Sequence, residues 1–190
     1  MNRLFAAALE LQQFFEARGW RFCFIGGLAV QRWGEPRLTL DVDCTLLTGF
    51  GEEARYIDEL LGAYTGRVDG PREFALANRV LLLYGFSDVP LDVALGAMPF
   101  EERCIERASS FDIGNGQALL TCSAEDLIVF KAFAGRDRDW LDIETIILRQ
   151  QNGLEIETIR RELIPLLELK EDPDTETRLP IRIAVCLKLT

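Results

Sequence analysis

The chain has 190 residues, 48% of them hydrophobic, and a formal net charge of −10. This size and composition exclude wholesale disorder and suit one ordinary domain, or a small core with a helical half. The absence of histidine excludes Ser-His-Asp and Cys-His catalysis and histidine-ligated zinc, and the acidic balance disfavours a broad, non-specific grip on nucleic acid.

The first elements of the chain are predicted from apolar spacing and glycines. Apolar residues at helical spacing predict an amphipathic helix from Arg3 to Ala17 that ends at Gly19. The next residues are expected to form a strand, a glycine turn, a short helix and a second strand, over 22–25, 26–27, 28–33 and 38–46.

The predicted strand over 38–46 carries Asp41 and Asp43. Side chains two apart on a strand point to the same face, so the two carboxylates should lie side by side. Carboxylate oxygens bind Mg²⁺, which usually completes its shell with water and substrate phosphates. Backbone amides at Gly26 and Gly27 could approach a phosphate closely, and the following helix offers its N-terminus to the same anion. The alternative for the glycines is a tight turn without a ligand.

Arg37 and Thr39 are expected on the same face of this strand as the two aspartates. One interpretation makes Arg37 an orienter of phosphate or carboxylate and Thr39 a hydrogen-bonding support. The other is a surface strand with an ion pair of little energetic weight.

The rest of the chain is expected to alternate helices, hairpins and loops. Helices are predicted over 52–64 and 99–108, then from an N-cap at Ser123 to Gly135, and over 140–149 and 155–169. Hairpins are predicted from 79–84 with 89–95 and from 111–113 with 118–120, a loop over 170–179, and a docked apolar tail over 180–190.

Two charged residues stand out in these later elements. Asp92 is flanked by apolar residues on the second arm of the first hairpin, where it either projects toward the aspartate pair or lies on a solvated face. Lys131 lies within an apolar helix, where a cation is costly unless an anion accompanies it.

A family resemblance rests on the glycine pair and the segment that follows it. Gly26-Gly27 followed by Arg37-Leu38-Thr39-Leu40-Asp41-Val42-Asp43 resembles the signature of the DNA polymerase β type nucleotidyltransferase superfamily, in the form seen in the AbiEii/AbiGii toxin-like branch. The resemblance covers most of the chain and implies an α/β fold, a small mixed sheet flanked by helices. It implies a catalytic core over 1–110 and a mostly helical region over 111–190 that closes over the nucleotide.

The resemblance also assigns roles to later residues. The family expects a third carboxylate on a later strand, for which Asp92 is the candidate. Asp-Leu-Ile-x-x-Lys-x-x-Ala followed by Arg138-Asp139-x-x-Asp142 is similar to the C-terminal motif of the AbiEii-like branch. Carried over, Lys131 contacts the triphosphate, and Asp142 or Asp139 assists. The alternative is a snorkelling lysine and a helix-capping aspartate.

The expected enzyme is a nucleotidyltransferase that moves an NMP from an NTP to an acceptor hydroxyl with two Mg²⁺ ions, or Mn²⁺. The catalytic and metal-binding residues would be Asp41, Asp43 and Asp92. The resemblance favours RNA, such as a tRNA 3′ end, as the acceptor of a toxin-like enzyme with a cognate antitoxin. The runner-up is transfer to an aminoglycoside or lincosamide, whose cationic character would suit the acidic chain. A third hypothesis is an inactive nucleotide-binding module.

Compartment and redox state follow from simpler patterns. The five cysteines are scattered without CxxC spacing, so neither a disulfide framework nor a zinc site is indicated. The N-terminus does not resemble a signal peptide, and no stretch approaches the roughly 20 apolar residues of a membrane span. We therefore expect a cytoplasmic protein without a membrane segment.

Overall fold

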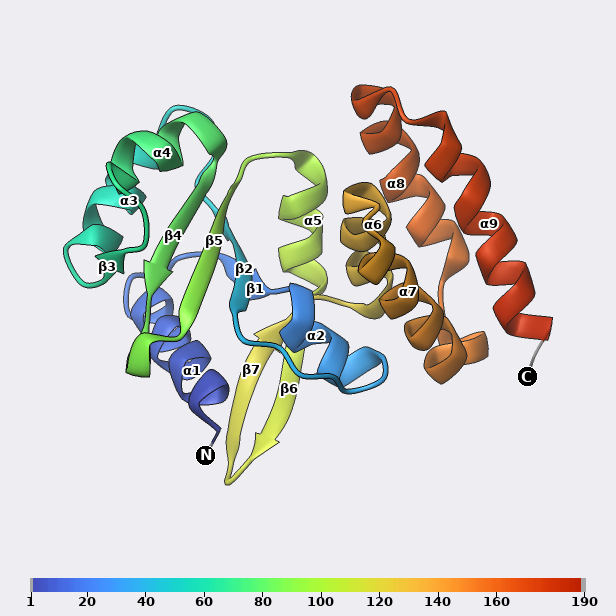
Figure 1. Ribbon diagram of the computed structural model, residues 1–190, viewed down its shortest axis with the longest axis horizontal. Helices are drawn as coiled ribbons and strands as arrows, with labels where there is room; N and C mark the ends of the chain where they lie inside the picture. The colour runs from blue at the N-terminus through green and yellow to red at the C-terminus, as the bar shows by residue number, and fades with distance from the viewer. Residues whose placement is uncertain (1, 189–190) are drawn as a thin grey trace. The chain divides into compact units, whose positions relative to one another are not determined.

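A computed structural model describes residues 2–188, and a mixed β-sheet is its organising element (Figure 1). The strands are β1 (Phe22–Phe24), β2 (Val42–Leu47), β3 (Thr65–Gly66), β4 (Val80–Tyr84), β5 (Pro90–Gly96), β6 (Ser109–Gly114) and β7 (Gln117–Thr121). They form one seven-stranded sheet in the order β3-β4-β5-β2-β1-β7-β6. The β2/β5 and β1/β7 pairs are parallel, whereas the other neighbours are antiparallel.

Helices make up most of the remaining chain. The α-helices are α1 (Arg3–Glu16), α2 (Gly26–Trp33), α3 (Glu53–Leu61), α4 (Pro71–Asn78), α5 (Pro99–Arg107), α6 (Ala124–Ala134), α7 (Asp137–Gln150), α8 (Ile156–Lys170) and α9 (Pro173–Lys188). Short 3-10 turns are η1 (Phe86–Asp88) and η2 (Gln151–Gly153). Within the described residues, no helix combines the length and apolar character needed to cross a membrane.

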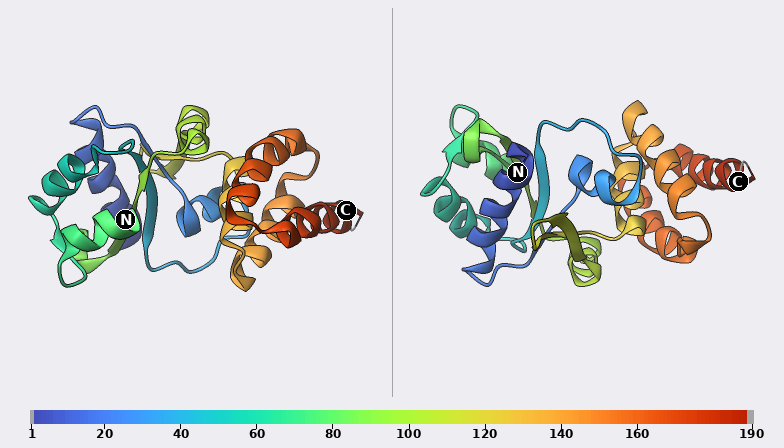
Figure 2. Two further views of the ribbon diagram at one scale, coloured as in Figure 1. Left: turned by 90° about the horizontal axis from the view of Figure 1, so that it is seen from above. Right: turned by 90° about the horizontal axis from the view of Figure 1, so that it is seen from below.

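The hydrophobic core lies on one face of the sheet. Side chains alternate along β4 and β5, so Leu81, Leu83, Leu91 and Val93 are fully buried while the intervening residues are partly exposed. Apolar faces of α1, α3 and α4 complete this core, and both views in Figure 2 show these three helices on the same side of the sheet. The opposite face of β2 and β5 is therefore left for partly exposed side chains, which include Asp43 and Asp92.

The described residues divide into two units. The first holds the described residues up to Leu28 together with Leu38–Cys122, and thus the whole sheet. The second holds Ala29–Arg37 and the residues from Ser123 onward, and in it α6 packs on α7 and α8, while α9 packs on all three. The sequence predicted segments of 1–110 and 111–190, and this boundary falls inside β6, which pairs with β7, while β7 pairs with β1.

Most predicted elements are confirmed with small shifts at their ends. These are the helices α1, α3, α5, α6, α7 and α8, the strand β1, and the hairpins β4–β5 and β6–β7. The predicted cap of α6 is also present, because the Ser123 hydroxyl oxygen accepts a hydrogen bond from the Asp126 N–H at 3.1 Å. The predicted α/β class is confirmed.

The predicted strand over 38–46 was wrong at its beginning. β2 begins at Val42, and the preceding residues are irregular, with Leu38 79% and Leu40 71% exposed. The physical reason is strand pairing: β5 offers partners from Val42 onward, and the three-residue β1 pairs only with the later part of β2. Arg37, Thr39 and Asp41 therefore lie outside the strand, and none of them shares a strand face with Asp43 as predicted.

Two further predictions need correction. Gly26 and Gly27 do not form a separate turn but open α2, although Gly26 keeps the left-handed φ of +58° that favours glycine. The polar segment 170–179 was predicted as a loop, yet α9 begins at Pro173, where proline suits a first helical turn. Most of its polar residues form the exposed side of a helix whose Thr175, Leu179, Ile183 and Cys186 are buried. Residues 189–190 of the predicted tail lie outside the described residues.

Candidate functional site

Asp43 and Asp92 lie side by side on the face of the sheet opposite the core. They are register partners on the parallel strands β2 and β5, and neighbouring side chains in register share a face. Both residues are partly exposed, whereas their sequence neighbours on each strand are buried. The pair thus joins two segments that are 49 positions apart in the sequence (92 − 43), and both carboxylates are accessible from solvent.

Asp41 lies just before β2 and belongs to the same acidic group. The Thr39 hydroxyl donates a 2.8 Å hydrogen bond to Asp41 Oδ1. Burial raises the pKa of Asp92, the guanidinium of Arg67 opposes this rise, and the charge of Asp41 adds to it. The negative charge of Asp41 therefore acts on Asp92. We call Asp41, Asp43 and Asp92 the acidic group, and their mutual repulsion favours a bound cation.

The two glycines leave space for the site residues. A Cβ on Gly26 would lie 1.9 Å from Asp43 Oδ2, and a Cβ on Gly27 would lie 2.4 Å from Thr39 Oγ1. The Gly27 N–H donates to Asp43 Oδ2 at 3.4 Å. The first turn of α2 is thus in contact with a carboxylate, consistent with the preference of a helix N-terminus for an anion.

Arg67 is a site residue that the sequence did not predict. Its backbone N–H donates to Leu82 O at 2.9 Å, so it continues the β3–β4 pairing opposite Leu82. Leu82 is in turn the register partner of Asp92. From this position the Arg67 guanidinium forms an ion pair with Asp92. No motif surrounds Arg67, so only the register of the sheet could have placed it here.

The acidic group fits Mg²⁺ by the chemistry of its donors, because hard divalent cations take carboxylate oxygens. In the part of the chain that the structure describes, no group of three or more histidine, cysteine, aspartate or glutamate side chains is arranged to hold a metal ion. A protein donor contacts each carboxylate instead: a threonine hydroxyl, a glycine amide or an arginine. A bound ion would compete with these donors.

The predicted residues Arg37, Lys131 and Asp142 lie together in the second unit. Asp142 Oδ1 accepts from Arg37 Nε at 2.8 Å, and Asp142 Oδ2 accepts from Lys131 Nζ at 2.7 Å. Asp139 Oδ1 also accepts from Lys131 Nζ, at 3.3 Å. Lys131 is only 5% and Asp142 only 4% exposed. These contacts form a buried ion-pair network, which satisfies the lysine that the apolar helix sequence made conspicuous.

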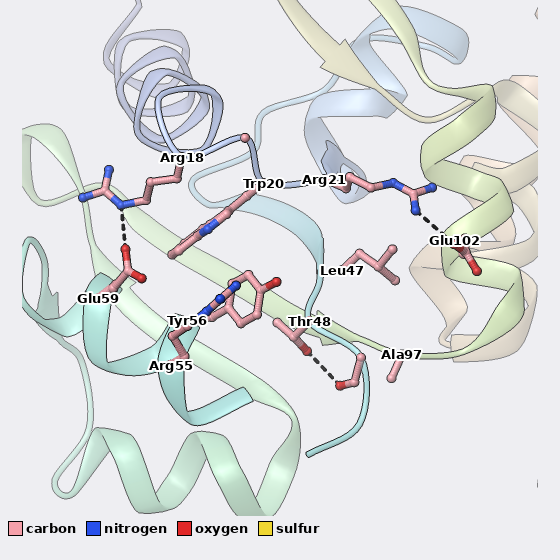
Figure 3. Close-up of a pocket in the computed structure, with 12 residues that line it drawn as sticks. Arg18, Trp20, Arg21, Leu47, Thr48, Arg55, Tyr56, Glu59, Ala97 and Glu102 are labelled. Atoms are coloured by element: carbon pink, nitrogen blue, oxygen red, sulfur yellow. Dashed lines mark hydrogen bonds and ion pairs between the residues drawn. The ribbon is translucent and has the colours of Figure 1, made fainter. Parts of the chain in front are cut away.

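A separate hollow of about 670 Å³ lies at the other end of β2. Figure 3 shows Trp20 and Tyr56 within it, and the ion pairs Arg18–Glu59 and Arg21–Glu102 at its sides. It is lined at the carboxyl ends of β2 and β5, whereas the acidic group lies toward their amino ends. None of the predicted site residues lines this hollow.

A mixed sheet with paired aspartates beside a glycine-opened helix defines a nucleotidyltransferase-like protein. The family comparison agrees with the geometry: the chain belongs to the family described as "Nucleotidyltransferase of unknown function (DUF6036)", which matches residues 2–165. The nucleotidyltransferase class predicted from the sequence is thereby confirmed, whereas the AbiEii/AbiGii branch is not supported by these comparisons. No curated protein sequence matches the chain.

Solved structures with the same fold include three nucleotidyltransferase-like or antibiotic-resistance proteins. An antigenic nucleotidyltransferase-like protein from Paracoccidioides brasiliensis is 16% identical, with a TM-score of 0.55, and the match covers 96% of this chain and 90% of that one. The antibiotic-resistance factor ANT(2″)-Ia is 16% identical, with a TM-score of 0.51 and coverage of 90% and 95%. The lincosamide adenylyltransferase LnuA is 15% identical, with a TM-score of 0.50 and coverage of 76% and 98%. At these identities the likeness shows the fold alone.

Proposed function

We propose that the protein transfers an NMP from an NTP to an acceptor hydroxyl. The observation that carries this proposal is the register of Asp43 with Asp92, beside a helix that opens with two glycines. In the reaction, the acceptor oxygen forms a bond to the α-phosphorus while the bond between that phosphorus and the leaving pyrophosphate breaks. The family and the fold support transfer as the reaction class.

Three aspartates carry the chemistry in this proposal. Asp41, Asp43 and Asp92 would hold two Mg²⁺ ions, or Mn²⁺, which when bound would supply charge neutralisation for the triphosphate and lower the pKa of the attacking hydroxyl. Asp92 would accept the proton of that hydroxyl, since burial already raises the pKa of this carboxyl group. Thr39 would keep Asp41 oriented through their hydrogen bond.

Nucleotide binding is proposed for the glycines and for three charged residues. Gly26 and Gly27 would let the triphosphate approach the backbone at the start of α2. Arg37, Lys131 and Asp142 are the other proposed nucleotide contacts, with Lys131 balancing phosphate charge. Because Lys131 is paired with two carboxylates, this role requires the lysine to exchange one of these partners for a phosphate oxygen.

Two acceptor classes follow from different observations. The glycine and aspartate motif favours an RNA 3′ end, with a toxin-like role beside a cognate antitoxin. The likeness in fold to a lincosamide adenylyltransferase and to an antibiotic-resistance factor favours a small-molecule acceptor. The donor NTP and the acidic group have the same roles with either acceptor, so one transfer assay tests both acceptor classes.

The test is transfer of label from each of the four α-labelled NTPs, with Mg²⁺, to tRNA, to lincomycin or to tobramycin. We expect Asp43→Asn to reduce transfer at least about 100-fold, because it removes a proposed metal ligand. Asp58→Asn is the matched control, because Asp58 is an exposed residue of α3 paired with Arg72. Nucleotide binding without transfer to any acceptor would instead indicate an inactive nucleotide-binding module. Equal transfer by both variants would contradict the proposed role of the acidic group.

A further inference from the structure

Four side chains form one cross-strand row over the face that carries the acidic group. Arg67 lies opposite Leu82, which pairs with Asp92, which pairs with Asp43. We call these four residues the Arg67–Asp43 row. Because residues in register share a face, the row points to one side of the sheet. Arg67 therefore ends the row on the side of Asp92 that is away from Asp43.

The guanidinium of Arg67 has a donor without a partner. One terminal nitrogen, Nη2, binds Asp92 Oδ1, and the side chain is 21% exposed. The Nε atom is buried and has no hydrogen-bond partner among the described residues. An unsatisfied buried donor is costly, and a charged one more so, so a ligand acceptor that draws the partly exposed guanidinium into a position where Nε is also satisfied would be favoured.

The position of Arg67 in the row indicates which substrate could supply that acceptor atom. In the proposed reaction the triphosphate approaches Gly26 and Gly27, on the β1 side of Asp43. Arg67 lies beyond Asp92 in the strand order β3-β4-β5-β2-β1, on the side opposite the glycines. The group that meets Arg67 is therefore part of the acceptor and not of the triphosphate.

We propose that Arg67 binds the acceptor, and that the acceptor carries an anionic oxygen close to its reacting hydroxyl, as the phosphodiester next to an RNA 3′ end does. This inference rests on the proposed function and specifies its substrate class. A guanidinium offers directional donors that suit phosphate oxygens.

Direct binding provides the first test and does not depend on turnover. A short RNA with a free 3′ hydroxyl and a 5′ fluorescein is titrated with the whole protein in Mg²⁺ buffer, and anisotropy is recorded. We expect Arg67→Met to weaken binding about 10-fold or more, since it removes hydrogen bonds to a charged group. Arg72→Met is the matched control, because it removes an arginine that pairs with Asp58 on the protein surface.

Arg67→Lys is a second variant, in case Arg67→Met does not fold. Lysine keeps the positive charge beside Asp92, but its single ammonium group cannot offer the paired N–H donors of a planar guanidinium. We expect it to bind RNA more weakly than wild type and to keep the wild-type circular dichroism spectrum and melting temperature within a few degrees. RNA binding by both Arg67 variants that equals wild type would overturn the inference, whatever their transfer activity.

A kinetic split separates acceptor binding from a merely structural role. With labelled NTP and the same RNA as acceptor, Arg67→Lys should raise the KM for RNA about 10-fold and leave the KM for NTP within about twofold. A rise in both constants would indicate general damage to the site and would overturn the assignment.

The outcomes also separate this inference from the proposed function. If the wild type transfers NMP to tobramycin or lincomycin and not to RNA, transfer stands and the phosphodiester acceptor is wrong. If the wild type binds neither NTP nor RNA, the proposed function fails and the inference fails with it. RNA binding that depends on Arg67, without transfer of NMP to any acceptor, would support the RNA-binding role of Arg67 and contradict the proposed transfer reaction.

Discussion

The buried carboxylate of Asp142 forms ion pairs with Arg37 and Lys131. Burial by itself would raise the pKa of Asp142, but hydrogen bonds from Arg37 and Lys131 outweigh burial and hold this pKa below its usual value. A lowered folded-state pKa means that the carboxylate stabilises the fold at any pH above its unfolded value. The stabilisation is lost as the pH falls through the folded value.

Asp142→Asn is therefore expected to destabilise the protein in a pH-dependent way. At pH 7 the loss should be roughly 3 kcal/mol, because the change removes the carboxylate shared by the buried Lys131 and the partly exposed Arg37. The gap to wild type should begin to shrink below about pH 4, where Asp142 becomes protonated in the unfolded chain, and should keep shrinking until the pH passes the lower pKa of the folded protein. Urea unfolding at pH 7 and pH 3 measures both values.

Glu168→Gln is the control for this prediction, since Glu168 is an exposed acidic residue of α8 in the same unit. We expect it to change stability by less than about 0.5 kcal/mol at either pH. A stability loss for Asp142→Asn that is the same at both pH values would argue that packing, and not charge, explains its effect.

At the scale of elements, the start of α2 depends on a residue without a side chain. Gly26 has a φ of +58°, and its missing Cβ leaves room for Asp43. Gly26→Ala is expected to cost at least about 1 kcal/mol through the left-handed backbone alone. It should also displace Asp43 and so lower any transfer activity. Urea denaturation and the labelled-NTP assay measure the two effects.

Gly153→Ala serves as the comparison for Gly26→Ala. A Cβ on Gly153 would meet no atom within 4 Å, and its φ lies outside the left-handed range. Its effect on stability should stay within about 0.5 kcal/mol. If Gly26→Ala is equally mild and the activity is unchanged, the close approach of Asp43 to α2 does not matter to the site.

Elements with a strong local pattern could be predicted from the sequence, and elements that depend on partners could not. Apolar spacing predicted α1 and α8, and Gly114 with Gly116 predicted the β6–β7 hairpin. The beginning of β2 is set by β5, a strand that pairs with it from elsewhere in the chain. The helix α9 was missed because a polar first turn that opens with Pro173 resembles a loop, while its packing against other helices is not visible in the sequence.

The candidate site shows the same division. The glycines and the first two aspartates form a local motif, so the sequence alone could indicate them. Asp92 was proposed from its flanking residues and a family resemblance, and the register of β2 with β5 places it next to Asp43. Arg67 has no local signal, because its importance arises only when β3, β4 and β5 align.

For the whole molecule, the burial of every cysteine gives a further prediction. All five thiols are buried and none forms a disulfide. A hydrogen bond with Cys104 and burial raise the pKa of Cys23, and burial with the charges of Asp43 and Asp92 raises that of Cys44. Thiolate is the reactive form. We therefore expect fewer than about one thiol per chain to react with Ellman's reagent within minutes in the native protein.

In guanidinium chloride, all five thiols should react rapidly, since unfolding removes both the burial and the shifted pKa. Cys186→Ala should lower the denatured count by one and leave the native rate unchanged, because Cys186 is itself buried in α9. Rapid reaction of two or more thiols in the native protein would show that the cores of the units open readily.

The second unit takes part of its structure from the early chain, and this has a consequence for dissecting the protein. Arg149 donates to the backbone carbonyl of Gly34, Gln150 donates to that of Trp33, and Arg37 supplies one of the cations on Asp142. A recombinant fragment starting at Ser123 would lack all three of these early residues. To obtain the helical unit alone, one would have to graft residues 29–37 onto it, or supply them as a separate peptide.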